Sequence, residues 1–167
     1  MTLHTFQLKN RFGQLHVAEY GGQLLHWQCP AGIERLYTPE QLQLVPERAL
    51  RGGVPVCFPQ FSDRGDLPKH GLVRTRPWKL QGQTESALIL AIEDDEHMRA
   101  LWPYAFSLVQ TLVLDADGLS ISLDFHNRSD QPLVFTGALH TYLRVPDVTA
   151  CTLHGLNGCV YEDAADD

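Results

Sequence analysis

Alternation of apolar and polar side chains is the feature that most limits how this chain can fold. Residues 119–126 read LSISLDFH, so that apolar side chains occupy every second position. A period of two is that of a β-strand with one buried face. The preceding apolar run, 104–114, reads YAFSLVQTLVL, and residues 115–118 between the two runs end in Asp-Gly. An Asp-Gly pair between two such runs predicts a tight hairpin and therefore an antiparallel sheet.

Strand patterns recur along the rest of the chain, separated at short intervals by Gly, Pro, Asn and Asp. One helical turn is expected at 94–101, where acidic residues come early and Arg99 comes late, as the helix dipole favours. Many short strands with few helices predict an all-β protein, an antiparallel sandwich or a barrel. The further predicted strands are 14–19, 23–28, 87–93, 132–143 and 149–156.

Length and composition predict one globular domain over residues 1–167. The chain has 167 residues, 44% of them hydrophobic and 20% charged, as in ordinary soluble proteins. The longest apolar run, Ala87 to Ile92, is far shorter than the roughly 20 residues of a membrane helix. The first residues lack a basic stretch leading into an apolar one, which disfavours a secretory signal. We therefore expect a cytoplasmic protein with no membrane partner.

Cysteine and histidine spacing argues against a bound metal. The four cysteines form no CxxC pair and have no histidine at metal-ligand spacing, so free thiols are expected and structural zinc is not. No GxSxG, HExxH, P-loop or GxGxxG motif is present. We expect neither a metal nor another cofactor.

The charge distribution points to a small anion. The net charge is −7, which disfavours nucleic acid as a partner. Residues 48–79, however, hold seven basic and two acidic side chains. Within this segment, residues 51–78 are rich in Gly and Pro and are expected to form a long, shaped loop. The segment is a candidate phosphate site, the alternative being a solvated loop whose charges pair with acids elsewhere.

Two histidines and two arginines are candidate site residues. His140 lies in an expected strand beside Gly137, which leaves room for a ligand, and imidazole exchanges protons near neutral pH. His70 lies in the loop, just before a glycine. Arg51 and Arg74 could offer guanidinium forks to a phosphate, or form ordinary ion pairs. The three tryptophans, at 27, 78 and 102, could stack on a sugar ring but fit a core role better.

Several ordered motifs resemble a known family. The runs RGGVPVCFP at 51–59 and LPKHGLVR at 67–74, followed by Trp78, resemble the first signature of the glucose-6-phosphate 1-epimerases, which belong to the aldose 1-epimerase superfamily. ALHTYL at 138–143 and the residues from Gly155 to Tyr161 resemble the second signature, in the same order. The resemblance extends over nearly the whole chain.

The resemblance implies a galactose mutarotase-like antiparallel β-sandwich that interconverts the α and β anomers of a hexose 6-phosphate by ring opening between C1 and O5. His140 would be the general acid at the ring oxygen, and His70 a second sugar contact near it. Arg51 and Arg74 would hold the 6-phosphate. No cofactor is implied.

The resemblance also implies that this chain is the N-terminal portion of the family domain. Family members are longer, and their general base is a Glu on a strand that follows the second signature; Glu162 and Asp163 come too early to match it. An incomplete sandwich would expose an edge that favours self-association. One alternative is a sugar-phosphate-binding β domain without catalysis. Another, a cupin-like metal isomerase, is disfavoured because no two histidines show close spacing within a strand.

Overall fold

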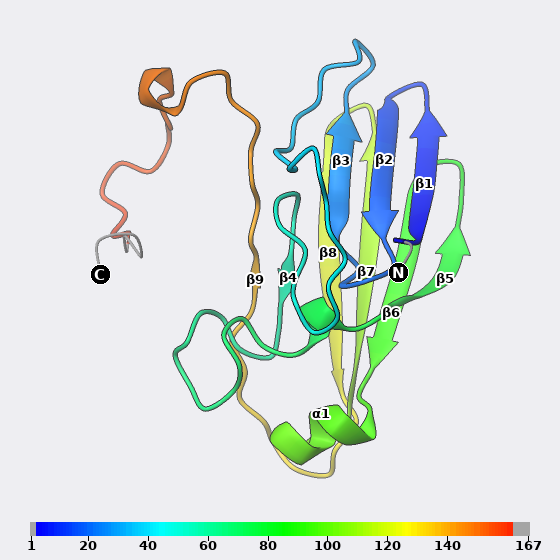
Figure 1. The fold of residues 1–167 in the computed structure, drawn as a ribbon, viewed down its shortest axis with the longest axis vertical. Helices are drawn as coiled ribbons and strands as arrows, with labels where there is room; N and C mark the ends of the chain where they lie inside the picture. The colour runs from blue at the N-terminus through cyan, green and yellow to red at the C-terminus, as the bar shows by residue number, and fades with distance from the viewer. Residues whose placement is uncertain (1–2, 162–167) are drawn as a thin grey trace.

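The computed structural model describes residues 3–161, most of whose regular structure is antiparallel sheet (Figure 1). Three strands, β1 (Thr5–Asn10), β2 (Gly13–Ala18) and β3 (Leu24–Gln28), form one sheet. A second sheet holds β5 (Lys79–Gln83), β6 (Ala87–Glu93), β7 (Phe106–Asp115) and β8 (Gly118–Asn127) in that order. The short strands β4 (Val56–Cys57) and β9 (Ala138–Leu139) pair with each other, and the helical turns are η1 (Val73–Thr75), α1 (Glu96–Leu101) and η2 (Val148–Ala150).

The two larger sheets pack face to face, which confirms the predicted antiparallel sandwich (Figure 1). Every second residue of β7 is buried, because its apolar side chains point between the sheets. Leu15 and Val17 of β2 meet Leu108 and Leu112 of β7 in one hydrophobic cluster. Trp78 is fully buried in this cluster, and Trp27 and Trp102 pack against it, so the tryptophans have the core role that fitted them better.

The strongest local signals are confirmed. β7 and β8 pair in register from Phe106–Asn127 to Asp115–Gly118, so that Ala116 and Asp117 form the two-residue turn of the predicted hairpin. The predicted helix is also present as α1. Its N-cap is Asp95, whose carboxylate accepts a hydrogen bond from the backbone N–H of Met98 at 2.7 Å.

Strand prediction fails after residue 131. Of the expected strand 132–143, only Ala138–Leu139 is regular, although residues 136–142 run alongside residues 53–59. The N–H of Thr136 donates to Pro59 and that of His140 to Pro55, but a proline cannot donate in return, so the ladder between the segments stays incomplete. The strand expected at 149–156 is wrong, since this stretch holds the end of η2 and then irregular chain.

Three strands were not predicted: β1, β5 and the two-residue β4, which lies within the stretch expected to be a long loop. β5 is largely exposed and carries no apolar alternation, and Gly82 lies where its pairing with β6 shifts register. β1 offers two inward apolar side chains, Phe6 and Leu8. β1 and β5 pair as edge strands with β2 and β6; the alternation within β1 is short, and β5 has none.

The segment after β9 arches away from the sandwich (Figure 1). It exposes several apolar side chains, among them Val148 and Leu153, each 76% exposed. Self-association through exposed surface remains a prediction. All four cysteines are free thiols, as expected. Across residues 3–161, no helix has the length and hydropathy that a membrane crossing requires.

Candidate active site

The pairing of β4 with β9 forms one wall of the candidate site. It aligns Val56 with Leu139 and Cys57 with Ala138, and so brings the Gly- and Pro-rich loop beside the strand that leads into His140. Gly53 has a φ of +61°, and a Cβ there would lie 2.1 Å from the carbonyl oxygen of Leu24. Only glycine permits this close approach, which fixes the position of the neighbouring Arg51.

A second glycine seats His70. Gly71 has a φ of +78°, and a Cβ there would lie 2.2 Å from the carbonyl oxygen of Phe58. The N–H of Leu72 donates to the same oxygen at 2.8 Å. The loop carrying His70 therefore lies directly against the end of β4.

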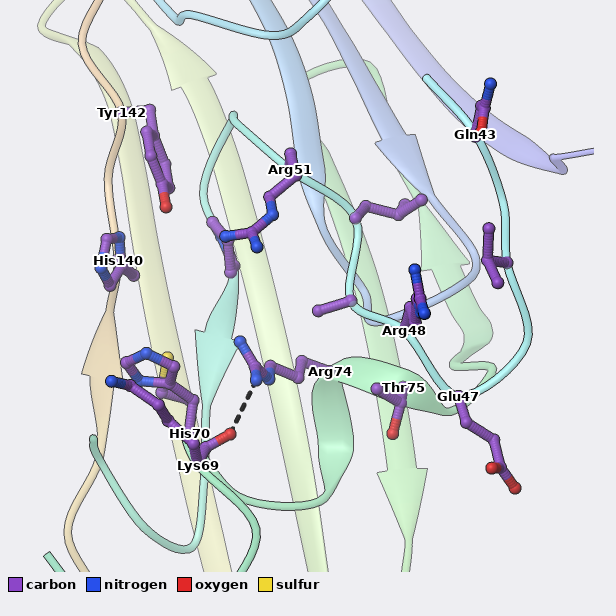
Figure 2. Close-up of a pocket in the computed structure, with 15 residues that line it drawn as sticks. Gln43, Glu47, Arg48, Arg51, Lys69, His70, Arg74, Thr75, His140 and Tyr142 are labelled. Carbon is purple, nitrogen blue, oxygen red and sulfur yellow. Dashed lines mark hydrogen bonds between the residues drawn. The ribbon is translucent and has the colours of Figure 1, made fainter. Parts of the chain in front are cut away.

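The rings of His70 and His140 lie next to each other on one side of the pocket, in edge-to-face contact (Figure 2). Their centroids are 5.5 Å apart and their planes are nearly perpendicular. The backbone N–H of Ser62 donates to Nδ1 of His70 at 3.2 Å, so the neutral ring carries its proton on Nε2. Burial, followed by the positive charge of Arg74, lowers the pKa of His70. His70 therefore presents a neutral N–H donor at neutral pH.

His140 is held from two sides. Its backbone N–H donates to the carbonyl of Pro55 at 3.0 Å, and its ring stacks on Tyr142 with centroids 4.9 Å apart. The stacked phenol limits the directions in which the imidazole can point. Together these contacts aim the ring of His140 into the pocket (Figure 2).

Positive charge gathers opposite the histidines. The half-buried Arg74 donates from Nη2 to the backbone carbonyl of Lys69 at 2.7 Å, while its buried Nε has no hydrogen-bond partner in the structure. Burial lowers the pKa of Arg74. The exposed Arg51 extends its guanidinium toward the same space (Figure 2). Since guanidinium presents several donors in a plane, the two side chains can bind an anion between them.

All four predicted site residues line one pocket of about 700 Å³. This size lies within the range that small-molecule sites occupy. Four further polar lining side chains had no motif of their own; three come from the segment before Arg51 and one directly follows the run at 67–74. They are Gln43, Glu47, Arg48 and Thr75. None of the three tryptophans lines the pocket.

Cys57 also lines the pocket, and burial raises the pKa of its thiol. A neutral, buried thiol is a poor nucleophile. The two imidazoles can transfer protons, and the guanidiniums can bind an anion.

Known proteins resemble this chain in sequence and in fold. The family model described as aldose 1-epimerase matches residues 4–165. The chain belongs to the aldose 1-epimerase family. A relative from Cenchrus ciliaris, named "Putative glucose-6-phosphate 1-epimerase", is 30% identical over 156 residues, which are 86% of this chain and 47% of that protein.

Solved structures show the same fold. The structure described as a "putative mutarotase" from Salmonella typhimurium superposes with a TM-score of 0.73 at 29% identity, over 87% of this chain and 50% of that one. A galactose mutarotase related enzyme from Lactobacillus acidophilus, 17% identical, superposes with a TM-score of 0.75 over 89% of this chain and 52% of that one. The fold is therefore galactose mutarotase-like. This member of the aldose 1-epimerase family spans about half the length of the curated relatives it matches.

Proposed function

We propose that this chain binds a hexose 6-phosphate in the 700 Å³ pocket and that His140 assists the interconversion of its α and β anomers. One observation carries the proposal: two imidazoles and two guanidiniums, drawn from segments up to 89 residues apart, line the same cavity (Figure 2). Family membership and the printed name of the Cenchrus ciliaris relative support the reaction type and the phosphorylated substrate.

In the proposed reaction, His140 donates a proton to the ring oxygen O5 as the C1–O5 bond breaks. The resulting aldehyde rotates about C1–C2, and closure on its other face gives the second anomer. His70, neutral and protonated on Nε2, donates a hydrogen bond to the sugar beside O5. General acid–base assistance of this kind is worth about 10²–10⁴-fold in rate.

The phosphate group would bind at the arginine side of the pocket. Arg74 has one guanidinium nitrogen fixed by the Lys69 carbonyl, which orients the rest of the fork. Arg51 extends toward the same space from the loop that precedes β4 (Figure 2). Binding the phosphate away from C1 holds the pyranose in one orientation and places O5 near His140.

Ring opening also requires a base that removes the proton of the C1 hydroxyl. Among the described residues that line the pocket, the one carboxylate is that of the exposed Glu47, whose side chain points away from both histidines (Figure 2). This observation favours a second candidate function, a sugar-phosphate-binding domain in which this chain supplies the acid and the anion site without the base.

Proton NMR exchange spectroscopy on the anomeric signals of glucose 6-phosphate separates the two candidates. If the chain is an epimerase, the wild-type protein accelerates exchange over buffer, His140→Ala loses at least about 100-fold of that acceleration, and His126→Ala, on the exposed end of β8, loses none. If exchange matches buffer while the sugar phosphate shifts protein resonances, the binding domain is supported. Absence of both effects would refute both functions.

A further inference from the structure

A second pair of histidines faces outward from the other side of the β1–β2–β3 sheet. His16 on β2 lies directly opposite His26 on β3 in the antiparallel register. The neighbouring pair, Leu15 and Trp27, points inward to the core. Because side chains alternate between faces, the two imidazoles lie side by side on the outer face.

The pair borders its own hollow of about 200 Å³. Gln14 and Gln28, the next cross-strand pair on the same face, complete its lining. No residue of this hollow lines the sugar pocket. A ligand bound here would therefore occupy a different part of the molecule from the proposed substrate.

Each ring has an unprotonated nitrogen whose electron pair can bind a metal ion. Oε2 of Glu34 accepts a hydrogen bond from Nδ1 of His26 at 3.1 Å, which leaves the lone pair on Nε2. The other oxygen of Glu34 accepts from the backbone N–H groups of Trp27 and Leu36, so the carboxylate is held rigidly. A carboxylate on the far nitrogen is the usual support of a metal-binding histidine, because it orients the ring and makes Nε2 more basic.

His16 is prepared in a similar way. Its Nε2 contacts the side-chain amide nitrogen of Gln14. Because that amide nitrogen can only donate, Nε2 of His16 is the unprotonated nitrogen. The amide is part of a flexible side chain, so an incoming ion can displace it.

We propose that His16 and His26 together bind one divalent transition-metal ion, with Zn²⁺ as the natural occupant. The ring centroids are 5.6 Å apart at an interplanar angle of 77°. This separation suits two imidazoles on one ion, since each ring centre then lies about 3 Å from an ion bound at about 2 Å. Imidazole nitrogen suits zinc, nickel and copper, and water fills the remaining positions.

The site is built from two protein ligands. Within residues 3–161, no three His, Cys, Asp or Glu side chains gather at one point suited to a metal. Two imidazoles on neighbouring strands can nevertheless chelate one ion, because an ion bound to the first imidazole meets the second at high effective concentration.

The other histidine pair is a poorer metal site despite a similar spacing. Nδ1 of His70 accepts from a backbone N–H, so Nε2 of the neutral ring carries a proton. Arg74 and Lys69 line the same pocket, and their charges repel a cation. His16 and His26 instead have the carboxylate of Glu34 beside them.

Isothermal titration calorimetry with ZnCl₂ alone tests the site on the purified chain. We expect His16→Gln and His26→Gln each to weaken Zn²⁺ binding about 100-fold. Glu34→Gln should weaken it about tenfold by releasing the His26 ring. His126→Gln, a histidine on β8 outside this hollow, is the matched control and should bind like the wild type.

Nitrogen-15 spectra of the histidine rings supply a second readout that does not depend on the variants folding. Zn²⁺ should shift the Nε2 signals of His16 and His26 in the wild-type protein. The proposal is overturned if these signals stay fixed at millimolar Zn²⁺. It is equally overturned if both folded single variants bind as the wild type does, or if His140→Gln abolishes binding while His16→Gln preserves it.

Discussion

Replacing Gly71 by alanine should damage both the fold and the candidate site. The residue has a φ of +78°, which costs a residue with a Cβ about 1–2 kcal/mol. Its new Cβ would also lie 2.2 Å from the carbonyl oxygen and 2.4 Å from the carbonyl carbon of Phe58. These are backbone atoms, so the loop must move by about 1 Å, which adds about 1–3 kcal/mol.

The matched control is Gly32→Ala. Gly32 has almost the same φ, +77°, but a Cβ there would meet nothing within 4 Å. It should therefore show the backbone cost alone, about 1–2 kcal/mol, against roughly 2–5 kcal/mol for Gly71→Ala. Urea unfolding at equilibrium measures both values, with an unchanged slope showing that the unfolded state is unaltered.

The two variants should differ in ligand binding as well. Because Gly71 follows His70 directly, the displaced loop moves the imidazole away from His140, and affinity for glucose 6-phosphate falls. Gly32 does not line the pocket, so Gly32→Ala should bind normally. Equal stability losses in the two variants would refute the reasoning that close contact with Phe58 seats His70.

Three other perturbations probe separate parts of the structure. Arg74→Ala should weaken the binding of glucose 6-phosphate about 10- to 100-fold, measured by calorimetry, because charge-assisted hydrogen bonds contribute about 1.5–3 kcal/mol. The affinity for glucose should change little. Equal losses of affinity for the two sugars would exclude a role of Arg74 in binding phosphate. Gln110→Leu should raise the free energy of unfolding by about 1–2 kcal/mol, because both amide atoms of this fully buried side chain lack hydrogen-bond partners. A loss of stability would show that the amide of Gln110 does form hydrogen bonds. The pKa of His70 in the folded chain lies below the ordinary 6.5, so between these two pKa values the unfolded chain binds more protons, and stability should fall as pH drops below about 6.5. In urea titrations between about pH 7.5 and pH 5.5, His70→Gln should lose less stability on acidification than the wild type. The same pH dependence in both proteins would contradict this prediction.

Local patterns were sufficient to predict the β7–β8 hairpin at one edge of the four-stranded sheet and helix α1. The alternation at 119–126 predicts a strand and the Asp-Gly pair predicts a turn, and both form between residues that are close in the sequence. Local patterns were insufficient for β9, because the length of this strand depends on the backbone N–H groups that residues 53–59 can donate to it. Pro55 and Pro59 interrupt that ladder, and only the pairing partner, not the strand itself, contains the reason.

The candidate site shows the same division. His140, His70, Arg51 and Arg74 were selected by residue type and by resemblance to family motifs, and they do line one pocket. The contribution of Arg48 to the lining could be anticipated only as one charge in a basic segment. Its position depends on how residues 43–50 fold back over the sheet, a long-range feature without a local pattern.

The outward histidine pair was invisible to spacing along the chain. His16 and His26 are ten residues apart and lie on different strands, so close spacing within one strand does not reveal the pair. Their proximity follows from the β2–β3 register. That register includes an irregularity after His16, which an alternating pattern alone does not locate.

In the proposed function, His70, His140 and Arg74 bind the same ligand. Side-chain NMR of the wild-type chain during titration with glucose 6-phosphate tests it most directly, by following the imidazole nitrogens and the Arg74 Nε signal together. We expect all three signals to shift with one dissociation constant, while the signals of the His126 ring stay unchanged. Saturable shifts confined to residues outside the 700 Å³ pocket would contradict it.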